Sequence, residues 1–298
     1  MTKPIQILLQ TTIPFEEDNW HIGRFSLLRD ELAARKDKKG APLFDVTTRD
    51  REVDAAGNDP VLSTLDVSEF DELWLFAIDN GDGLSVPDCQ GITRFRQRGG
   101  GIMATRDHQD LGISLCTLGG IGRAHFFHTK HPEPDPSRHV PDDKDTTSIS
   151  WPNYHSGRNG DYQTITATYP HEVLRRNAST KLIEFFPSHP HEGAVGVPEG
   201  EEHARVIATG QSKVTGRPFN LVVTFDSSRD EHGNQLGCGI AESSFHHFVD
   251  YNLDTGMGCP SFLEEPPGDG YKRNPQALED IRTYVRNVAV WLAGSSVG

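Results

Sequence analysis

The chain has 298 residues, 35% of them hydrophobic and 24% charged, which suffices for a sizeable core in one α/β domain with long loops. Its formal net charge of −14 at pH 7 argues against a protein that binds duplex nucleic acid, because such a protein needs a basic face against the phosphates, and it disfavours anionic membrane surfaces. We therefore expect a small-molecule ligand as the partner, and the composition is compatible with a homo-oligomer.

The first hundred residues predict alternating strands and helices. Short apolar runs alternate with stretches whose apolar residues recur at helical spacing. In chain order, strands are expected over 5–12, 44–50, 72–79 and 101–107, and helices over 24–36 and 88–100, with a short helix or turn within 61–71. This order predicts a parallel, doubly wound sheet.

The second half of the chain predicts a long loop, further strands and a final helix. Residues 126–160 are rich in Pro, Asp, Ser and His and show no period, and loops of this length are usually functional or disordered. Strands are expected over 162–169, 180–187, 204–211, 219–226 and 237–248, the last running into two histidines. The final helix is expected over 274–294, with Asn274 as its N-cap, Pro275 at its first position and Gly294 after its end.

These elements together predict one α/β domain over residues 1–298. We expect a three-layer sandwich with a flavodoxin-like, mostly parallel sheet, a β-rich C-terminal extension and long loops, because neither an internal repeat nor a linker is visible.

Three sequence features indicate a cytoplasmic location. The four cysteines are scattered without a CxxC pair, so reduced thiols are expected rather than a disulfide framework. The first residues lack a charged segment followed by a sustained apolar one, so no signal peptide is expected. The longest apolar runs, LWLFAI and VAVWLA, are too short to span a bilayer.

The stretch GGGIMATRDHQD, residues 99–110, places three glycines before a short strand and a polar turn. With the order of elements and the late strand ending in histidine, it resembles the class I glutamine amidotransferase-like superfamily and, within it, the trehalose-utilisation (ThuA-like) branch. The likeness spans about residues 5–115 and 180–294. It implies a flavodoxin-like sandwich with its site at the carboxyl ends of the parallel strands, where open α/β sheets generally bind ligands.

One departure from the superfamily pattern concerns the nucleophile. In the amidotransferases, the turn after the GGG strand carries a cysteine that a late-strand histidine activates. Here that turn falls at Arg106, whose guanidinium cannot act as a thiolate, and Cys116 lies about ten residues further on. No glutaminase activity is therefore expected, and the ThuA-like branch likewise tends to lack the cysteine.

Two strand ends supply the candidate catalytic residues, which are Arg106, Asp107, His108, Glu242, His246 and His247. Arg106 offers a positive fork for an anion or oxyanion, and a histidine can exchange a proton near neutral pH. Asp107 or Glu242 would orient that imidazole. In a continuing strand only one of His246 and His247 faces the pocket, and Glu242 would share the face of His246. The alternative for Asp107 is the N-cap of a following helix.

Further candidates lie outside these two strand ends. Asp79, Tyr154, His155 and Arg158 are candidate substrate-binding residues, the first at the end of the strongest strand and the others in a loop that can close over a polar ligand. The alternatives are a turn stabilised by Asp79 and a surface or interface loop. His189 and His191 form an HPH segment that can grip one metal, although Pro190 also suits a simple turn. His125 and His128, at helical spacing, are a further candidate pair of metal ligands.

Two functions of different class follow from these residues. The first is an enzyme of hydrolase or isomerase type that uses histidine and carboxylate groups on a small polar substrate, such as a sugar derivative. The second is a non-catalytic ligand-binding or assembly subunit that keeps the fold. A divalent metal is compatible with the first. No nucleotide cofactor is expected, because GGIGRAH, residues 119–125, matches neither a phosphate loop nor a dinucleotide fingerprint.

Overall fold

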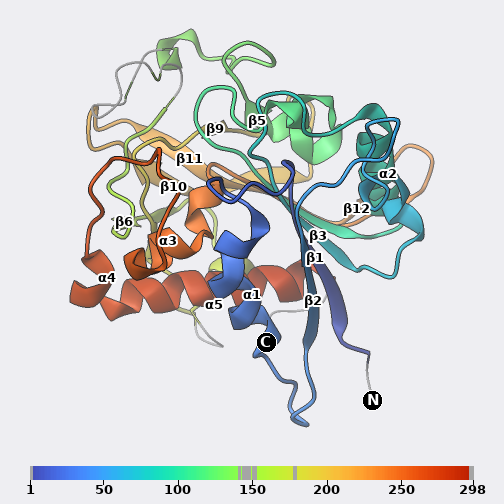
Figure 1. Cartoon of the computed structure of the whole chain (residues 1–298), viewed down its shortest axis with the longest axis horizontal. Coiled ribbons are helices and arrows are strands. Elements are labelled where there is room, and N and C mark those ends of the chain that lie inside the picture. Colours follow the sequence, from blue (N-terminus) through green and yellow to red (C-terminus); the bar gives the residue numbers. More distant parts are fainter. Residues whose placement is uncertain (1–2, 140–141, 143–148, 150–152, 177–179, 295–298) are drawn as a thin grey trace.

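The computed structural model describes residues 3–139, 142, 149, 153–176 and 180–294 (Figure 1). Its centre is an eight-stranded sheet in the order β2-β1-β3-β4-β14-β11-β10-β7. The first five strands in this order are parallel, and each of the last three is antiparallel to its neighbour. Their bounds are β1 Ile5–Thr11, β2 Phe44–Arg49, β3 Glu72–Phe76, β4 Gly101–Thr105, β7 Thr166–Ala167, β10 Ala204–Gln211, β11 Pro218–Phe225 and β14 Gly239–Glu242.

Helices cover both faces of this sheet, which confirms the predicted α/β sandwich. Alternate residues of β3 point to opposite faces: Trp74 and Phe76 pack with α1 (Ser26–Ala33) and α5 (Pro275–Leu292), whereas Leu73 and Leu75 pack with α2 (Val86–Gln97). Because both faces are buried, the strand is apolar from Leu73 to Phe76, as parallel strands usually are.

The ends of two helices follow from local sequence. Ser85 and Asp88 form a capping box at the start of α2, in which each side chain binds the backbone N–H of the other residue. At α5, Pro275 occupies the first turn and Gly294 follows the end with φ +71°. Asn274 stands at the N-cap position as predicted, but its side chain makes no capping hydrogen bond.

Short elements fill the connections. The remaining strands pair in twos: β5 His125–Phe126 with β9 Ala194–Val195, β6 Tyr162–Thr164 with β8 Phe185–Pro187, and β12 Ser228–Arg229 with β13 Gln235–Leu236. Two further α-helices are α3 Asp250–Leu253 and α4 Gly270–Arg273. The 3₁₀ turns are η1 Ile22–Phe25, η2 Leu62–Val67, η3 Ile113–Thr117, η4 Gly120–Ala124, η5 Pro136–Arg138, η6 Glu172–Leu174, η7 Phe245–His247 and η8 Thr255–Met257.

Several predicted elements differ in the structure. The strand expected over 162–169 is divided between β6 and β7, which lie in different sheets. His125 lies in β5, so its spacing to His128 is not helical. The last predicted strand ends at Glu242, and the two histidines lie in η7 instead. Of the loop expected over 126–160, residues 140–141, 143–148 and 150–152 lie outside the described residues.

The topology brings two of the predicted segments together. β4 and β14 are parallel neighbours, and Thr105 pairs with Glu242 in their register, so both strands end at the same level of the sheet. The residues that follow them therefore emerge side by side at the carboxyl edge. Among the helices of the described residues, none has the length and apolarity that a membrane span requires.

Candidate functional site

The turn after β4 and the turn after β14 are joined by hydrogen bonds. The backbone N–H of Phe245 donates to the carbonyl of Arg106 at 2.9 Å, and the hydroxyl of Ser244 donates to Oδ1 of Asp107 at 3.3 Å. The same hydroxyl accepts from the backbone N–H of His246 at 3.1 Å. These contacts fix Asp107 and His246 next to each other, as the predicted topology requires.

A third segment, the predicted HPH motif, completes a buried cluster of Asp107, His189 and His246. Nε2 of His189 lies 3.6 Å from Oδ1 of Asp107, and Nε2 of His246 lies 3.6 Å from Oδ2. One donor atom from each of the three residues lies within 4.8 Å of the other two, and the side chains are at most 3% exposed. Two imidazoles and a carboxylate at this spacing form a set that can hold a divalent ion.

The hydrogen bonds of the cluster set the tautomer of His189. Its Nδ1 lies 2.8 Å from Oδ1 of Asn159, an acceptor, so Nδ1 carries the hydrogen and Nε2 presents a lone pair towards Asp107. Nε2 of His189 has no hydrogen-bond partner among the described residues. A lone pair and a carboxylate facing each other at 3.6 Å require a cation or a proton between them.

The protonation states favour metal ligation as well. Burial, together with the neighbouring His246 and His191, lowers the pKa of His189 well below its usual value, so this imidazole is neutral. Burial by itself would raise the pKa of Asp107, but attraction from His246 and His108 lowers it. A neutral imidazole and an ionised carboxylate are the forms that bind metals.

The cluster opens onto a cavity of about 820 Å³. Its wall carries Asn19, Trp20, Ile78, Asn80, Asp107, His108, Leu111, Ile149, Arg158, His189, Pro190, His191, His246, Phe262, Leu263, Glu264, Glu265 and Pro266. His191 binds Glu265 through Nε2 at 2.9 Å, and its ring lies 5.5 Å from that of His108 between centroids. Nε2 of His108 lies 3.9 Å from Asp107, and burial lowers its pKa. The wall thus holds acid–base groups beside the cluster.

Arg106 does not line the cavity, contrary to the prediction that it binds an anion there. Its side chain is fully buried, away from the cavity wall, and donates to the carbonyls of Ala194 (3.4 Å) and Gln109. Its guanidinium lies 4.3 Å from the centroid of the Phe127 ring, and burial lowers its pKa to about 9. Arg106 therefore ties the turn to β9, while the next residue, Asp107, points into the cavity.

His247 and Glu242 also lie away from this cavity. Nδ1 of His247 is 3.2 Å from Glu242 and Nε2 is 3.2 Å from Glu192. Burial alone would lower the pKa of His247, but the two carboxylates raise it to about 10. The predicted shared face of Glu242 and His246 is wrong because β14 ends at Glu242 and η7 turns the chain, which places Glu242 with His247.

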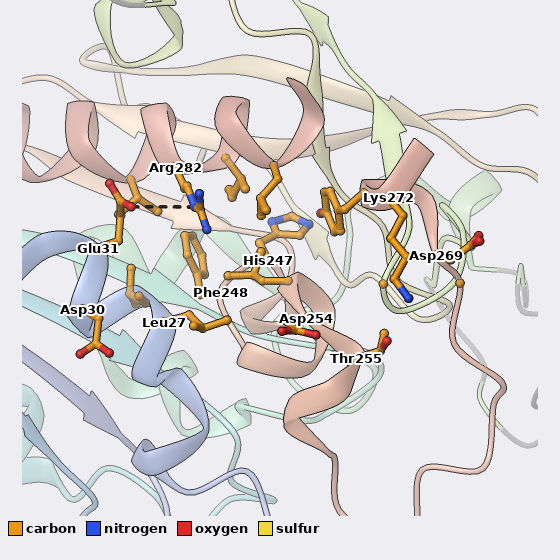
Figure 2. Close-up of a pocket in the computed structure, with 18 of the residues that line it drawn as sticks. Leu27, Asp30, Glu31, His247, Phe248, Asp254, Thr255, Asp269, Lys272 and Arg282 are labelled. Carbon is orange, nitrogen blue, oxygen red and sulfur yellow. Dashed lines mark ion pairs between the residues drawn. The ribbon is translucent and has the colours of Figure 1, made fainter. Parts of the chain in front are cut away.

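A second cavity, of about 610 Å³, has His247 in its wall. Figure 2 shows His247 and Phe248 at its inner end, with Leu27 and the Glu31–Arg282 ion pair on helices that flank it. Consecutive residues of η7 therefore face two different cavities: His246 lines the first and His247 the second.

Of the four predicted substrate-binding residues, Arg158 alone is part of the described cavity wall. Asp79 instead accepts hydrogen bonds from the hydroxyls of Thr12 and Ser114, both at 2.7 Å, so it stabilises the turn after β3. Tyr154 stacks on Phe219 with centroids 4.6 Å apart. His155 is buried with Nδ1 3.3 Å from the carbonyl of Pro190.

Cys116, the cysteine that follows the turn at Arg106 in the sequence, lies outside the described wall of the 820 Å³ cavity. This residue lies in η3, and burial raises the pKa of its thiol to about 11. The helix expected after β4 is this 3₁₀ turn, and its N-cap is Gly112, so Asp107 is not a helix cap.

Sequence reasoning missed three residues of the site. Trp20 packs its ring edge-on against His246, with centroids 4.9 Å apart, Asn159 orients His189, and Glu265 binds His191. Trp20 and Glu265 lie in loops without a motif. The signal for Asn159 was its place in a polar loop that also supplied Arg158.

Comparison with known proteins supports the fold at low sequence identity. No protein-family model matches the chain, and no curated protein matches it either. A ThuA-like protein from Parabacteroides merdae ATCC 43184 has a similar solved structure, with a TM-score of 0.51 and 16% identity, over 99% of this chain and 92% of that one. The mmIFT52 N-terminal domain gives a TM-score of 0.54 at 10% identity, over 98% and 99% of the two chains.

A third similar structure is the glutaminase domain of CTPS from Trypanosoma brucei, with a TM-score of 0.46 and 12% identity over 95% and 94% of the two chains. The chain has the fold of the ThuA-like structure from Parabacteroides merdae, which agrees, at the level of the fold, with the resemblance seen in the sequence.

Proposed function

We propose that this protein is a metal-dependent enzyme of hydrolase or isomerase type, and not a glutaminase, that acts on a small polar substrate in the 820 Å³ cavity. The observation that carries the proposal is the cluster of Asp107, His189 and His246 at the cavity wall, whose donor atoms lie within 4.8 Å of one another.

The donor set suits a first-row divalent ion such as Zn²⁺, Mn²⁺ or Fe²⁺. Two imidazole nitrogens and one carboxylate leave coordination positions free for water or substrate. Asn159 holds His189 by its other ring nitrogen, as the outer partners of metal-bound histidines commonly do. Held by Asp107, His189 and His246, such an ion would supply a Lewis acid for a substrate oxygen and would make a bound water more acidic.

The chain's own residues supply acid–base groups beside this position. Burial keeps His108 neutral at pH 7, so it can accept a proton from the reacting group. His191, which Glu265 binds at 2.9 Å, is placed to return one. The side chains of Asn19, Asn80 and Arg158 on the wall can bind the hydroxyl groups of a sugar derivative.

The test is a search for metal-dependent turnover. Purified protein, loaded with Zn²⁺, Mn²⁺ or Fe²⁺, is incubated with a panel of sugars and sugar acids, and products are followed by mass spectrometry. We expect conversion of at least one compound, its loss after chelation and its return with the metal. The matched control is His232→Asn, since His232 is a 73% exposed histidine outside the cavity. Binding of a compound without conversion under any metal would favour the non-catalytic subunit instead.

A further inference from the structure

Glu192 is a fully buried carboxylate outside the described walls of both cavities. Its oxygens are surrounded by four donors. Oε1 accepts from the hydroxyl of Ser156 and the side-chain amide of Gln163, and Oε2 accepts from the hydroxyl of Ser243 at 2.8 Å and from Nε2 of His247 at 3.2 Å. Every lone-pair direction of the carboxylate is therefore used.

These donors come from the segments that carry the metal cluster. Ser156 accepts the backbone N–H of His189 at 2.9 Å, and it lies three residues before Asn159, which orients His189. Ser243 and His247 flank Ser244 and His246. Glu192 itself follows His189 by three residues, so one carboxylate joins the loop of Asn159, the segment of His189 and the turn of His246.

The backbone reinforces the same junction. Glu192 and Tyr154 exchange N–H···O bonds of 3.0 and 3.1 Å, and the N–H of Gly193 donates to the carbonyl of Ser243 at 3.1 Å. The partner carboxylate of His247, Glu242, is held by the hydroxyl of Tyr284 on α5. The network thus reaches from the strand end to a helix of the sandwich.

Burying the charge of Glu192 costs desolvation free energy, and filling the same space does not need a charged group. Apolar side chains of similar volume commonly fill such a space without the desolvation of ions. A hydrogen-bonded carboxylate fixes the positions of its partners, because each of its four hydrogen bonds requires its donor at one place. The metal cluster needs its segments held in fixed positions, since its ligands come from three separate segments and productive sites tolerate displacements of only about 0.5 Å.

We infer that Glu192 is the positioning residue of the site: it sets the separation of His189 and His246 from Asp107 without contacting the metal or the substrate. This inference rests on the proposed function, because it assigns Glu192 to the assembly of that metal site.

The test measures Co²⁺ binding to the full chain by titration calorimetry and records the visible spectrum of the bound ion. Glu192→Gln keeps the size of the side chain but places an amide where Oε2 accepts two bonds. We expect its affinity for Co²⁺ to fall about 10- to 100-fold, the usual effect of an outer partner of a metal ligand, with a changed d–d spectrum. Glu192→Asp, which retains the charge, should recover part of both.

Two controls separate the outcomes. Glu72→Gln alters another fully buried carboxylate, one hydrogen-bonded to Trp74 and outside the cluster, and should leave Co²⁺ binding unchanged. If Glu192→Gln does not fold, Ser243→Ala takes its place in the test. This variant removes one hydrogen-bond donor to Glu192, and we expect it to lose less Co²⁺ affinity than Glu192→Gln would. Wild-type affinity and spectrum in both Glu192→Gln and Ser243→Ala would overturn the inference while leaving the proposed function intact. A wild-type protein that binds no Co²⁺ at all would overturn both.

Discussion

The imidazole rings of His189 and His246 stack face to face, with centroids 3.6 Å apart and planes 12° apart. Two imidazolium ions would repel each other strongly at this distance, whereas a metal ion is bound by neutral imidazoles. Asp107 lies 3.6 Å from Nε2 of each ring. The stack is therefore best suited to two neutral ligands that share a cation with Asp107, and the predictions below follow from this.

The first prediction concerns Asn159. Asn159→Leu removes the acceptor that fixes the hydrogen on Nδ1 of His189, so both tautomers become available and the affinity for Co²⁺ should fall about 10- to 100-fold. Asn159→Asp keeps an acceptor at the same place and should restore most of the affinity. Calorimetric titration of the two variants distinguishes these results, and equal affinities for Leu and Asp would contradict the role assigned to Asn159.

A second prediction separates catalysis from metal binding at His108. His108→Asn removes the proposed general base but none of the three cluster ligands, so kcat on a substrate found by the metabolite screen should fall about 10²- to 10⁴-fold. The metal content, measured by plasma mass spectrometry, should stay at the wild-type level. His232→Asn is the control for both measurements. A variant that keeps wild-type kcat would remove His108 from the mechanism.

Arg106 should matter for stability rather than for ligand binding. Arg106→Met leaves the carbonyls of Ala194 and Gln109 without their donor in a buried place, which costs about 1–3 kcal/mol of unfolding free energy. Urea denaturation measures the loss. The folded variant should bind Co²⁺ and the substrate as the wild type does. An unchanged stability with weakened substrate binding would show that the guanidinium reaches the ligand after all.

The elements that sequence alone could predict are those with local signals. The apolar strands β1, β3 and β4, bounded by polar turns, gave the parallel half of the sheet, and the rule for strand ends placed Asp107 beside His246. His189 could not be placed in this way, because it reaches the cluster through a loop whose path depends on tertiary contacts such as those of Ser156.

The assignment of faces after Glu242 failed for a related reason. The alternation of side chains holds only while the strand continues, and β14 ends one residue before Ser243. The 3₁₀ turn that follows directs His246 and His247 to different cavities. Similarly, the sequence of the turn at Arg106 showed a charged residue at a site edge, but not that its side chain points away into the interior.

Glu72 gives a prediction on the pH dependence of stability. Burial raises the pKa of this carboxyl well above its usual value, and Oε1 has no hydrogen-bond partner among the described residues. Because the pKa of Glu72 is raised in the folded state, its contribution to the free energy of unfolding is fully present below the unfolded pKa, near 4.5. This contribution is lost as the pH rises through the folded pKa.

Glu72→Gln should therefore stabilise the protein at pH 8, by on the order of 1 kcal/mol, and the difference from the wild type should shrink towards pH 5. Thermal unfolding of both proteins across this range provides the measurement. A difference that grows as the pH falls would have the wrong sign and would contradict the buried, protonated state.

The most direct test of the proposed metal site is a Co²⁺ titration of the metal-free protein with its three ligand variants, Asp107→Asn, His189→Ala and His246→Ala. The account predicts one ion per wild-type chain and at least about a hundredfold weaker binding in each variant, because each loses one of three ligands, while His232→Asn binds as the wild type. Equal binding in the wild type and all three variants, or no binding in the wild type, would contradict it.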